Sequence, residues 1–154
     1  MKRINVNLAT RIATEHLSYR SLIEEIETDL ARVSQTSTAS LDGLKKLLKS
    51  FYSQVRGHFA LEEKGGLFEV YDEHPLAFRK HARAMLDQHR VFLEHLRRIL
   101  ETVDRIERLD GPEFEHFSRD LRELIVALRK HERDEDELLE RLVDHDIRHG
   151  QGHP

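Results

Sequence analysis

Six polar residues stand at positions that otherwise belong to apolar stripes, in which residues recur alternately three and four apart. They are His16, His58, Glu62, His89, His131 and Glu135. Burying an isolated imidazole or carboxylate in an apolar core is costly, so such groups need polar partners or a metal ion. These six residues are therefore the candidates for a site inside the core.

Two pairs among the six share one spacing, His58 with Glu62 and His131 with Glu135. Residues four apart project side by side from a helix, so each pair would present an imidazole and a carboxylate together. The other two histidines would add one imidazole each. Neutral nitrogens combined with anionic oxygens suit iron, manganese or zinc, and suit calcium or magnesium poorly. Six protein ligands on two ions would leave positions open for dioxygen, peroxide or nitric oxide.

The competing interpretation is a set of structural histidines, because a single histidine on an apolar face is usually a hydrogen-bonded core residue. Four such histidines with two carboxylates at consistent depths favour a metal site. Glu63 is expected to face outward or to support a ligand, and Tyr19 to be a core residue that could line the site. The other histidines are expected in solvent or in a frayed tail: His74, His81, His95, His116, His145, His149 and His153. The four-residue spacing of His145 and His149 could also hold a stray ion.

The stripes predict four amphipathic helices, and short connections predict that they form an all-α, antiparallel, up-down four-helix bundle. The expected helices span residues 8–33, 40–64, 75–109 and 112–144, with a tail over 145–154. Ser and Thr within 34–40 are candidate N-caps for the second helix. Residues 67–73 could form a further short helical piece that covers the bundle end.

A helical rise of ~1.5 Å per residue tests whether the six residues can meet. It puts His16 at ~12 Å and Glu135 at ~14 Å from one end of the bundle, with His89 and His131 near ~20 Å. The pair on the second helix reaches that level if the helix persists through residues 67–72. The spread suits two metal ions better than one.

Length and composition fit this fold. The chain has 154 residues, a size typical of one domain, and 38% are hydrophobic while 35% are charged. Seven glycines and three prolines favour long helices over a turn-rich β fold. The absence of cysteine excludes disulfides, iron–sulfur clusters and thiolate zinc sites.

Other function classes find little support in the sequence. The formal charge of −4 is spread along the chain, and no basic patch with interleaved aromatics indicates nucleic-acid binding. No signal peptide and no apolar run long enough for a membrane span are visible. A soluble, cytoplasmic protein is expected, and the sequence identifies no protein partner.

The ordered set of six residues resembles the hemerythrin family, specifically the bacterial hemerythrin-like HHE cation-binding domains. The resemblance covers nearly the whole chain and implies a four-helix bundle with a non-haem di-iron centre. It implies that the first two histidines hold one iron, that His89 and His131 hold the other, and that Glu62 and Glu135 bridge them. The irons could share an oxo or hydroxo bridge, and manganese or zinc would be less usual.

The chain departs from the oxygen-carrying members of that family. They carry two ligand histidines one turn apart on the third helix, whereas Met85 and Leu93 flank His89 at that spacing here. They also have an aspartate five residues after the histidine of the fourth helix, where this chain has Glu135 after four. One iron would lack an imidazole unless Glu63 or water takes its place. This difference argues against simple reversible oxygen carriage.

The leading hypothesis is a hemerythrin-like di-iron protein that binds or senses a small ligand such as dioxygen, nitric oxide or peroxide. Alternatives are a di-iron oxidoreductase that consumes peroxide or nitric oxide, and an iron or redox sensor or iron-handling protein. No dedicated general acid or substrate pocket is visible, so enzymatic activity stays open. A bundle with one adventitious zinc or nickel ion is the remaining alternative.

Overall fold

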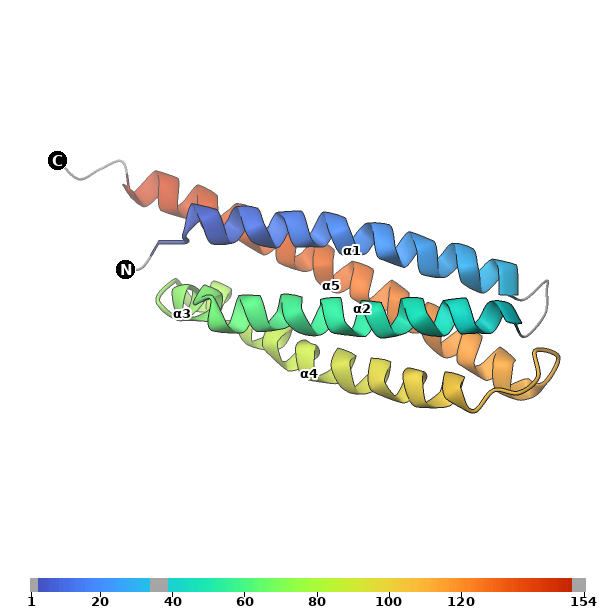
Figure 1. The fold of residues 1–154 in the computed structure, drawn as a ribbon. Coiled ribbons are helices and arrows are strands. Elements are labelled where there is room, and N and C mark those ends of the chain that lie inside the picture. The colour runs from blue at the N-terminus through green and yellow to red at the C-terminus, as the bar shows by residue number, and fades with distance from the viewer. Residues whose placement is uncertain (1–2, 34–38, 151–154) are drawn as a thin grey trace.

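Four long helices run antiparallel along the molecule, each reversing the direction of the one before it (Figure 1). The computed structural model describes residues 3–33 and 39–150. The helices are α1 (Val6–Val33), α2 (Ala39–Lys64), α3 (Leu67–Asp72), α4 (Leu76–Asp104) and α5 (Pro112–Gly150). Helix α1 packs against α2 and α5, and α4 also packs against α2 and α5. The order around the bundle is thus α1, α2, α4, α5, and the predicted all-α up-down bundle is confirmed.

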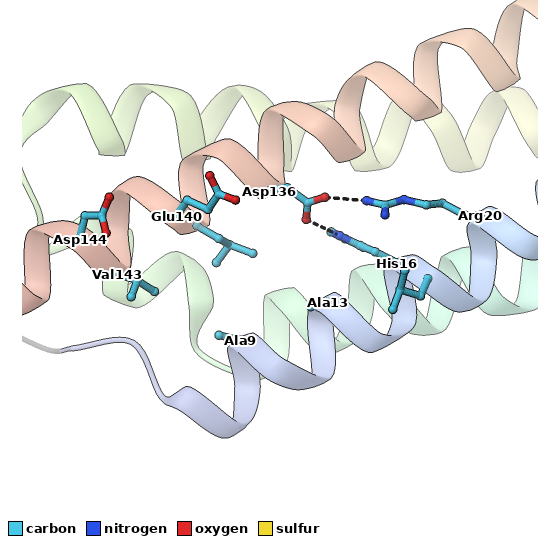
Figure 2. A pocket seen from close by; sticks show the side chains of 10 residues that line it. Ala9, Ala13, His16, Arg20, Asp136, Glu140, Val143 and Asp144 are labelled. Carbon is cyan, nitrogen blue, oxygen red and sulfur yellow. Dashed lines mark hydrogen bonds and ion pairs between the residues drawn. The ribbon is translucent and has the colours of Figure 1, made fainter.

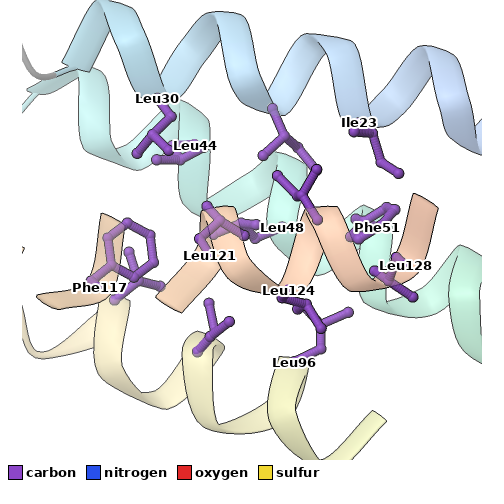
Figure 3. Packing of buried hydrophobic residues seen from close by; sticks show 14 of the residues in the cluster. Ile23, Leu30, Leu44, Leu48, Phe51, Leu96, Phe117, Leu121, Leu124 and Leu128 are labelled. Atoms are coloured by element: carbon purple, nitrogen blue, oxygen red, sulfur yellow. The ribbon is translucent and has the colours of Figure 1, made fainter. Parts of the chain in front are cut away.

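Each long helix buries the face that carries its apolar stripe. The larger apolar cluster fills the half of the bundle that holds the end of α1 and the start of α2. Figure 3 shows part of it, with Leu44, Leu48, Leu121 and Leu124 meeting between helices. A smaller cluster, which includes Ile12, fills the opposite end. No described helix is long and apolar enough to cross a membrane.

The short helix α3 confirms the predicted helical piece after the second stripe. Gly66 precedes it with a φ of 89°, in the left-handed region that glycine tolerates best. This reversal turns the chain so that Leu67, Val70 and Tyr71 are buried against the end of the bundle. Helix α3 contacts both α2 and α4, and so closes the end of the bundle at which α1 begins and α5 ends (Figure 1).

Two predicted helix ends were wrong. Helix α4 ends at Asp104 and not near residue 109, because Ile106 leaves the helical path and is buried in the larger apolar cluster. Helix α5 continues to Gly150, past the expected end near residue 144. Residues 145–149 are therefore helical and not a frayed tail. The candidate N-caps at residues 34–38 and the remaining tail at 151–154 lie outside the described residues.

Candidate metal centre

The six predicted site residues meet in the core, between the two apolar clusters. All are at most 3% exposed: His16, His58, Glu62, His89, His131 and Glu135. Each long helix contributes at least one of these residues. Along α1, α4 and α5 they lie between the residues that belong to the smaller apolar cluster and those that belong to the larger one. On α1, for example, His16 lies between Ile12 of the smaller cluster and Tyr19 of the larger one.

One group of donor atoms comprises His16, His58, Glu62 and Glu135. The Nε2 atoms of His16 and His58 are 2.9 Å apart, and Nε2 of His16 is also 2.9 Å from Oε1 of Glu135. Nε2 of His58 lies 2.8 Å from Oε1 of Glu62. Two nitrogens and two carboxylates thus surround one point.

A second group comprises His89, His131 and again Glu135. Nε2 of His131 is 3.4 Å from Oε2 of Glu135, whose Oε1 faces His16 in the first group. Oε1 of Glu62 is 3.9 Å from Nε2 of His89. Glu135 therefore offers one oxygen to each group, and Glu62 lies between His58 and His89.

Several of these buried atoms have no hydrogen-bond partner in the described part of the chain. They are both carboxylate oxygens of Glu62, both ring nitrogens of His89, Nε2 of His131 and Oε2 of Glu135. Glu62 Oε1 is close to His58, but the contact is not aligned as a hydrogen bond. Each unsatisfied buried group costs about 1–3 kcal/mol. Cations bound between the inward-facing nitrogens and oxygens would satisfy all of these atoms except Nδ1 of His89, which faces outward, so the donor set fits metal.

The four imidazoles turn their other nitrogen, Nδ1, toward an acceptor at the outside of the site. Nδ1 of His16 donates to Oδ1 of Asp136 at 2.7 Å, and Nδ1 of His58 donates to Oε2 of Glu15 at 3.0 Å. Donation from Nδ1 leaves the lone pair on Nε2, which is the tautomer that binds a metal. Two such lone pairs 2.9 Å apart would repel each other unless a cation or a proton lies between them.

The same arrangement continues on the other two helices. Nδ1 of His131 donates to Oε1 of Gln88 at 2.6 Å, and Nδ1 of His89 lies 3.6 Å from Oε2 of Glu63. Each long helix therefore provides both a candidate ligand and an oxygen for the histidine of a neighbouring helix. The acceptor for the histidine of α2 lies on α1, that for α4 on α2, that for α5 on α4, and that for α1 on α5.

The carboxylates make the two groups electrostatically different. Burial alone would lower the pKa of His58, but the adjacent Glu135 and Glu62 raise it to about 11. Burial, aided by the nearby Glu135, raises the pKa of Glu62 well above its usual value. Burial and the neighbouring His131 lower the pKa of His89 to about 3. His89 is thus a neutral imidazole, which is the form that can act as a ligand.

Aromatic side chains enclose the second group. The Phe59 ring stacks on His89 with centroids 3.8 Å apart, and Phe92 meets His131 edge-on at 5.1 Å. Met85, one turn before His89, is buried among apolar residues. Tyr19 lies beside the first group, with its ring centroid 5.8 Å from that of His16, and burial raises its pKa. The expectation that Tyr19 is a core residue near the site is confirmed.

A groove between α1 and α5 reaches the outer side of the first group (Figure 2). Its volume is about 620 Å³, and the small side chains of Ala9 and Ala13 leave room for it. Figure 2 shows Asp136 between His16 and Arg20, bonded to both. Arg20 also pairs with Glu132, which is 2% exposed. Solvent in the groove therefore meets the acceptor of His16, while the imidazole itself stays buried.

Three of the remaining histidines are less exposed than expected. His74 is 3% exposed, not solvated, because it lies in the corner after α3 and bonds to Asp146 of α5. His95 of α4 and His145 of α5 are half-buried, whereas His81 and His116 are exposed as expected. Glu63 faces outward beside His89, as expected.

The acceptors Glu15, Gln88 and Asp136 were missed by sequence reasoning. Each directly precedes or follows a candidate ligand in the chain, and that proximity was the only signal. It does not indicate that the acceptor serves the ligand of another helix, since this depends on how the helices pack.

No curated protein and no solved structure gave a significant match to the chain. The family model of the hemerythrin HHE cation binding domain matches residues 7–143, which include all six candidate ligands. A cation-binding domain agrees with the buried groups of His and Glu in the bundle. The chain therefore belongs to the hemerythrin HHE cation-binding domain family.

Proposed function

We propose that this protein holds two iron ions without haem and uses them to bind or sense a small ligand such as dioxygen, nitric oxide or peroxide. The observation that carries the proposal is the convergence of four Nε2 atoms on two shared carboxylates, with each Nδ1 facing an outer oxygen. An ordinary core histidine needs only hydrogen-bond partners, and this arrangement leaves inward nitrogens without one.

The two groups suggest how the ligands divide. His16 and His58 would hold one iron, His89 and His131 the other, and Glu135 would span both because each of its oxygens faces a different group. Bound iron would supply open coordination positions and a change of oxidation state. The same imidazole and carboxylate donors could also hold manganese or zinc, which are the less usual metals for this site.

The surroundings of the second group support binding of a small ligand there. This group has fewer protein donors than the first, and the apolar Met85 stands one turn before His89. Phe59, Phe68 and Phe92 face its imidazoles and exclude water from them. A dry, incompletely filled site favours a small, weakly polar molecule over a bulky polar substrate.

The smaller donor set also supports a second candidate, a di-iron oxidoreductase that consumes peroxide or nitric oxide. Catalytic turnover of peroxide should then disappear in His89→Ala and persist in His95→Ala, a half-buried histidine of the same helix. Turnover that survives His89→Ala would argue against this candidate. Iron or redox sensing is a variant of the main proposal, in which iron occupancy stabilises the bundle.

The deciding experiment measures iron per chain in untagged protein from iron-supplemented cells, beside a His58→Ala/His131→Ala variant. The parent should hold close to two irons and the variant almost none, while His116→Ala, at an exposed position, should match the parent. Anaerobically reconstituted ferrous protein should develop charge-transfer absorption in air. Iron content unchanged by the double substitution, or a fully loaded protein that stays colourless, would contradict the proposal.

A further inference from the structure

A second cluster of ligand-type side chains lies at the end of the bundle, away from the six core residues. It joins His74, in the corner between α3 and α4, to His145 and Asp146 on the last turns of α5. One donor atom from each of the three lies within 4.8 Å of the others. Glu135 and Asp146 are eleven residues apart on α5, about 16 Å at the usual helical rise, so the two sites are separate.

Both ring nitrogens of His74 face oxygen atoms. Its Nδ1 is 2.6 Å from the carbonyl oxygen of Val70, and its Nε2 is 2.8 Å from Oδ1 of Asp146. A neutral imidazole has one N–H and can donate to only one of these two oxygens. At 3% exposure no bulk water can relieve the mismatch. In the neutral imidazole one nitrogen therefore turns its lone pair toward an oxygen, and a metal ion between Nε2 and Oδ1 of Asp146 would relieve this contact.

His145 provides an independent indication of a ligand. Its Nδ1 is buried, has no hydrogen-bond partner in the described part of the chain, and lies 3.7 Å from Oδ1 of Asp146. Its ring centroid is 5.2 Å from that of His74. The other oxygen of Asp146 accepts a hydrogen bond from the amide of Ile4, which leaves Oδ1 for the cluster.

We propose that this cluster binds one zinc ion through Nε2 of His74, Nδ1 of His145 and Oδ1 of Asp146, with water as a fourth ligand. Two imidazoles and one carboxylate form a common zinc donor set. Ligands about 2.0–2.2 Å from a tetrahedral ion lie about 3.3 Å from one another. The observed separations of 2.8 Å and 3.7 Å fall on either side of that value, so small side-chain shifts suffice.

The bound ion would link three parts of the chain that are distant in sequence. His74 fixes the corner after α3, His145 and Asp146 fix the end of α5, and Asp146 already holds the amide of Ile4 ahead of α1. Bound zinc should therefore make this end of the bundle more stable, whatever occupies the core site.

The test uses the full chain with the core site removed by His58→Ala/His131→Ala and stripped with a chelator. Zinc titration should show one ion per chain. Either His145→Ala or Asp146→Asn, added to this background, should weaken zinc binding at least about tenfold. His116→Ala is the matched control, because His116 lies four residues from Asp120 on the exposed surface of α5 and should leave zinc binding unchanged.

A second measurement covers the case in which the double variant does not fold. Zinc should raise the thermal midpoint of the iron-loaded parent but not that of iron-loaded His145→Ala. No zinc binding to the folded double variant, or equal binding after both His145→Ala and Asp146→Asn, would overturn the proposal. Iron content in the core site is a separate readout, so failure here would leave the proposed di-iron function untouched.

Discussion

The orientation of the four core imidazoles depends on acceptors outside the site as well as on the groups inside it. The acceptor at Nδ1 selects the tautomer and fixes the ring, so that Nε2 faces the interior. Asp136, Glu15 and Gln88 do this by hydrogen bonds, while Glu63 lies at 3.6 Å from His89. These acceptors are partly or fully exposed at the surface, so they can be changed without opening a cavity in the core.

Gln88→Leu tests this positioning role. It removes the acceptor of His131 while leaving Nε2 and the core untouched, so metal affinity should fall about 10–100-fold with little change in folding. Competition with a chelator measures the affinity. Gln88→Glu, which keeps an acceptor, should restore most of it, and Gln54→Leu, an exposed position on α2, is the control. Parent-like affinity in Gln88→Leu would show that the oxygen does not position the ring.

Glu135 should matter more to iron content than any single histidine. Because its two oxygens face the two groups, Glu135→Ala should reduce iron from about two per chain to almost none. His89→Ala should leave about one. Elemental analysis of both variants decides this, with Glu140→Ala on the exposed face of α5 as control. Equal losses in the two variants would contradict a shared carboxylate.

The six core positions could be predicted because helical periodicity determines which residues share a face, and the helical rise determines their depth. His58 and Glu62 were expected at this depth only if the second helix persisted through residues 67–72; α2 ends at Lys64, and the pair still reaches the site. His74 could not be predicted as buried, because it lies outside any helix and its partner Asp146 is 72 residues away. Such a contact depends on how the corner after α3 meets the end of α5, which no local pattern encodes.

At the scale of elements, the turn between α2 and α3 depends on two glycines. A Cβ at Gly65 would lie 2.4 Å from the carbonyl oxygen of Leu61, and Gly66 has a φ of 89°. Gly66→Ala should cost about 1–2 kcal/mol of folding free energy, and Gly65→Ala at least as much. Gly57→Ala is the control, since nothing lies within 4 Å of its added Cβ and alanine favours the helix. Urea unfolding measures all three, and equal stabilities would refute the argument.

The seam between α1 and α5 holds a buried charge that depends on one arginine. Glu132 is 2% exposed and pairs with Arg20, so Arg20→Met should destabilise the protein by about 1–3 kcal/mol. Arg129 and Glu27 cross the same seam, but both side chains are 42% exposed, so Arg129→Met should cost under about 1 kcal/mol. Thermal or urea unfolding compares the two variants. A smaller effect for Arg20→Met would show that Glu132 is well solvated.

The ends of the elements were the least predictable feature at this scale. Residues 145–149 follow the last leucine of the stripe and are mainly polar, so the pattern gave no reason to continue the helix. Contacts from Ile4 and His74 to Asp146 hold those turns in place. The early end of α4 likewise follows from burial of Ile106, which only the assembled core can provide.

For the whole molecule, the decisive feature is that the polar site separates two unequal apolar clusters. The larger cluster includes Leu48, Leu96 and Leu121 and buries more apolar side chains than the smaller one, so its half of the bundle should depend less on the site. The smaller one, with Tyr71 and Met85, lies beyond the six polar residues and depends more on them. Without cations, several buried nitrogens and oxygens would lack partners. This loss of folding free energy should destabilise the end that holds the smaller cluster more than the other end.

Removing metal with a chelator should therefore loosen one end of the bundle before the other. Hydrogen exchange should accelerate in α3 and in the first half of α4, at least about tenfold, because local opening follows the weaker cluster. The amides near Leu121 and Leu48 should change much less. Mass spectrometry of peptides before and after chelation measures this in the His145→Ala variant, which lacks the proposed zinc site, so that only the loss of core metal can produce the change. Uniform acceleration along all helices would mean that the bundle opens as one unit and that the metal site stabilises both ends equally.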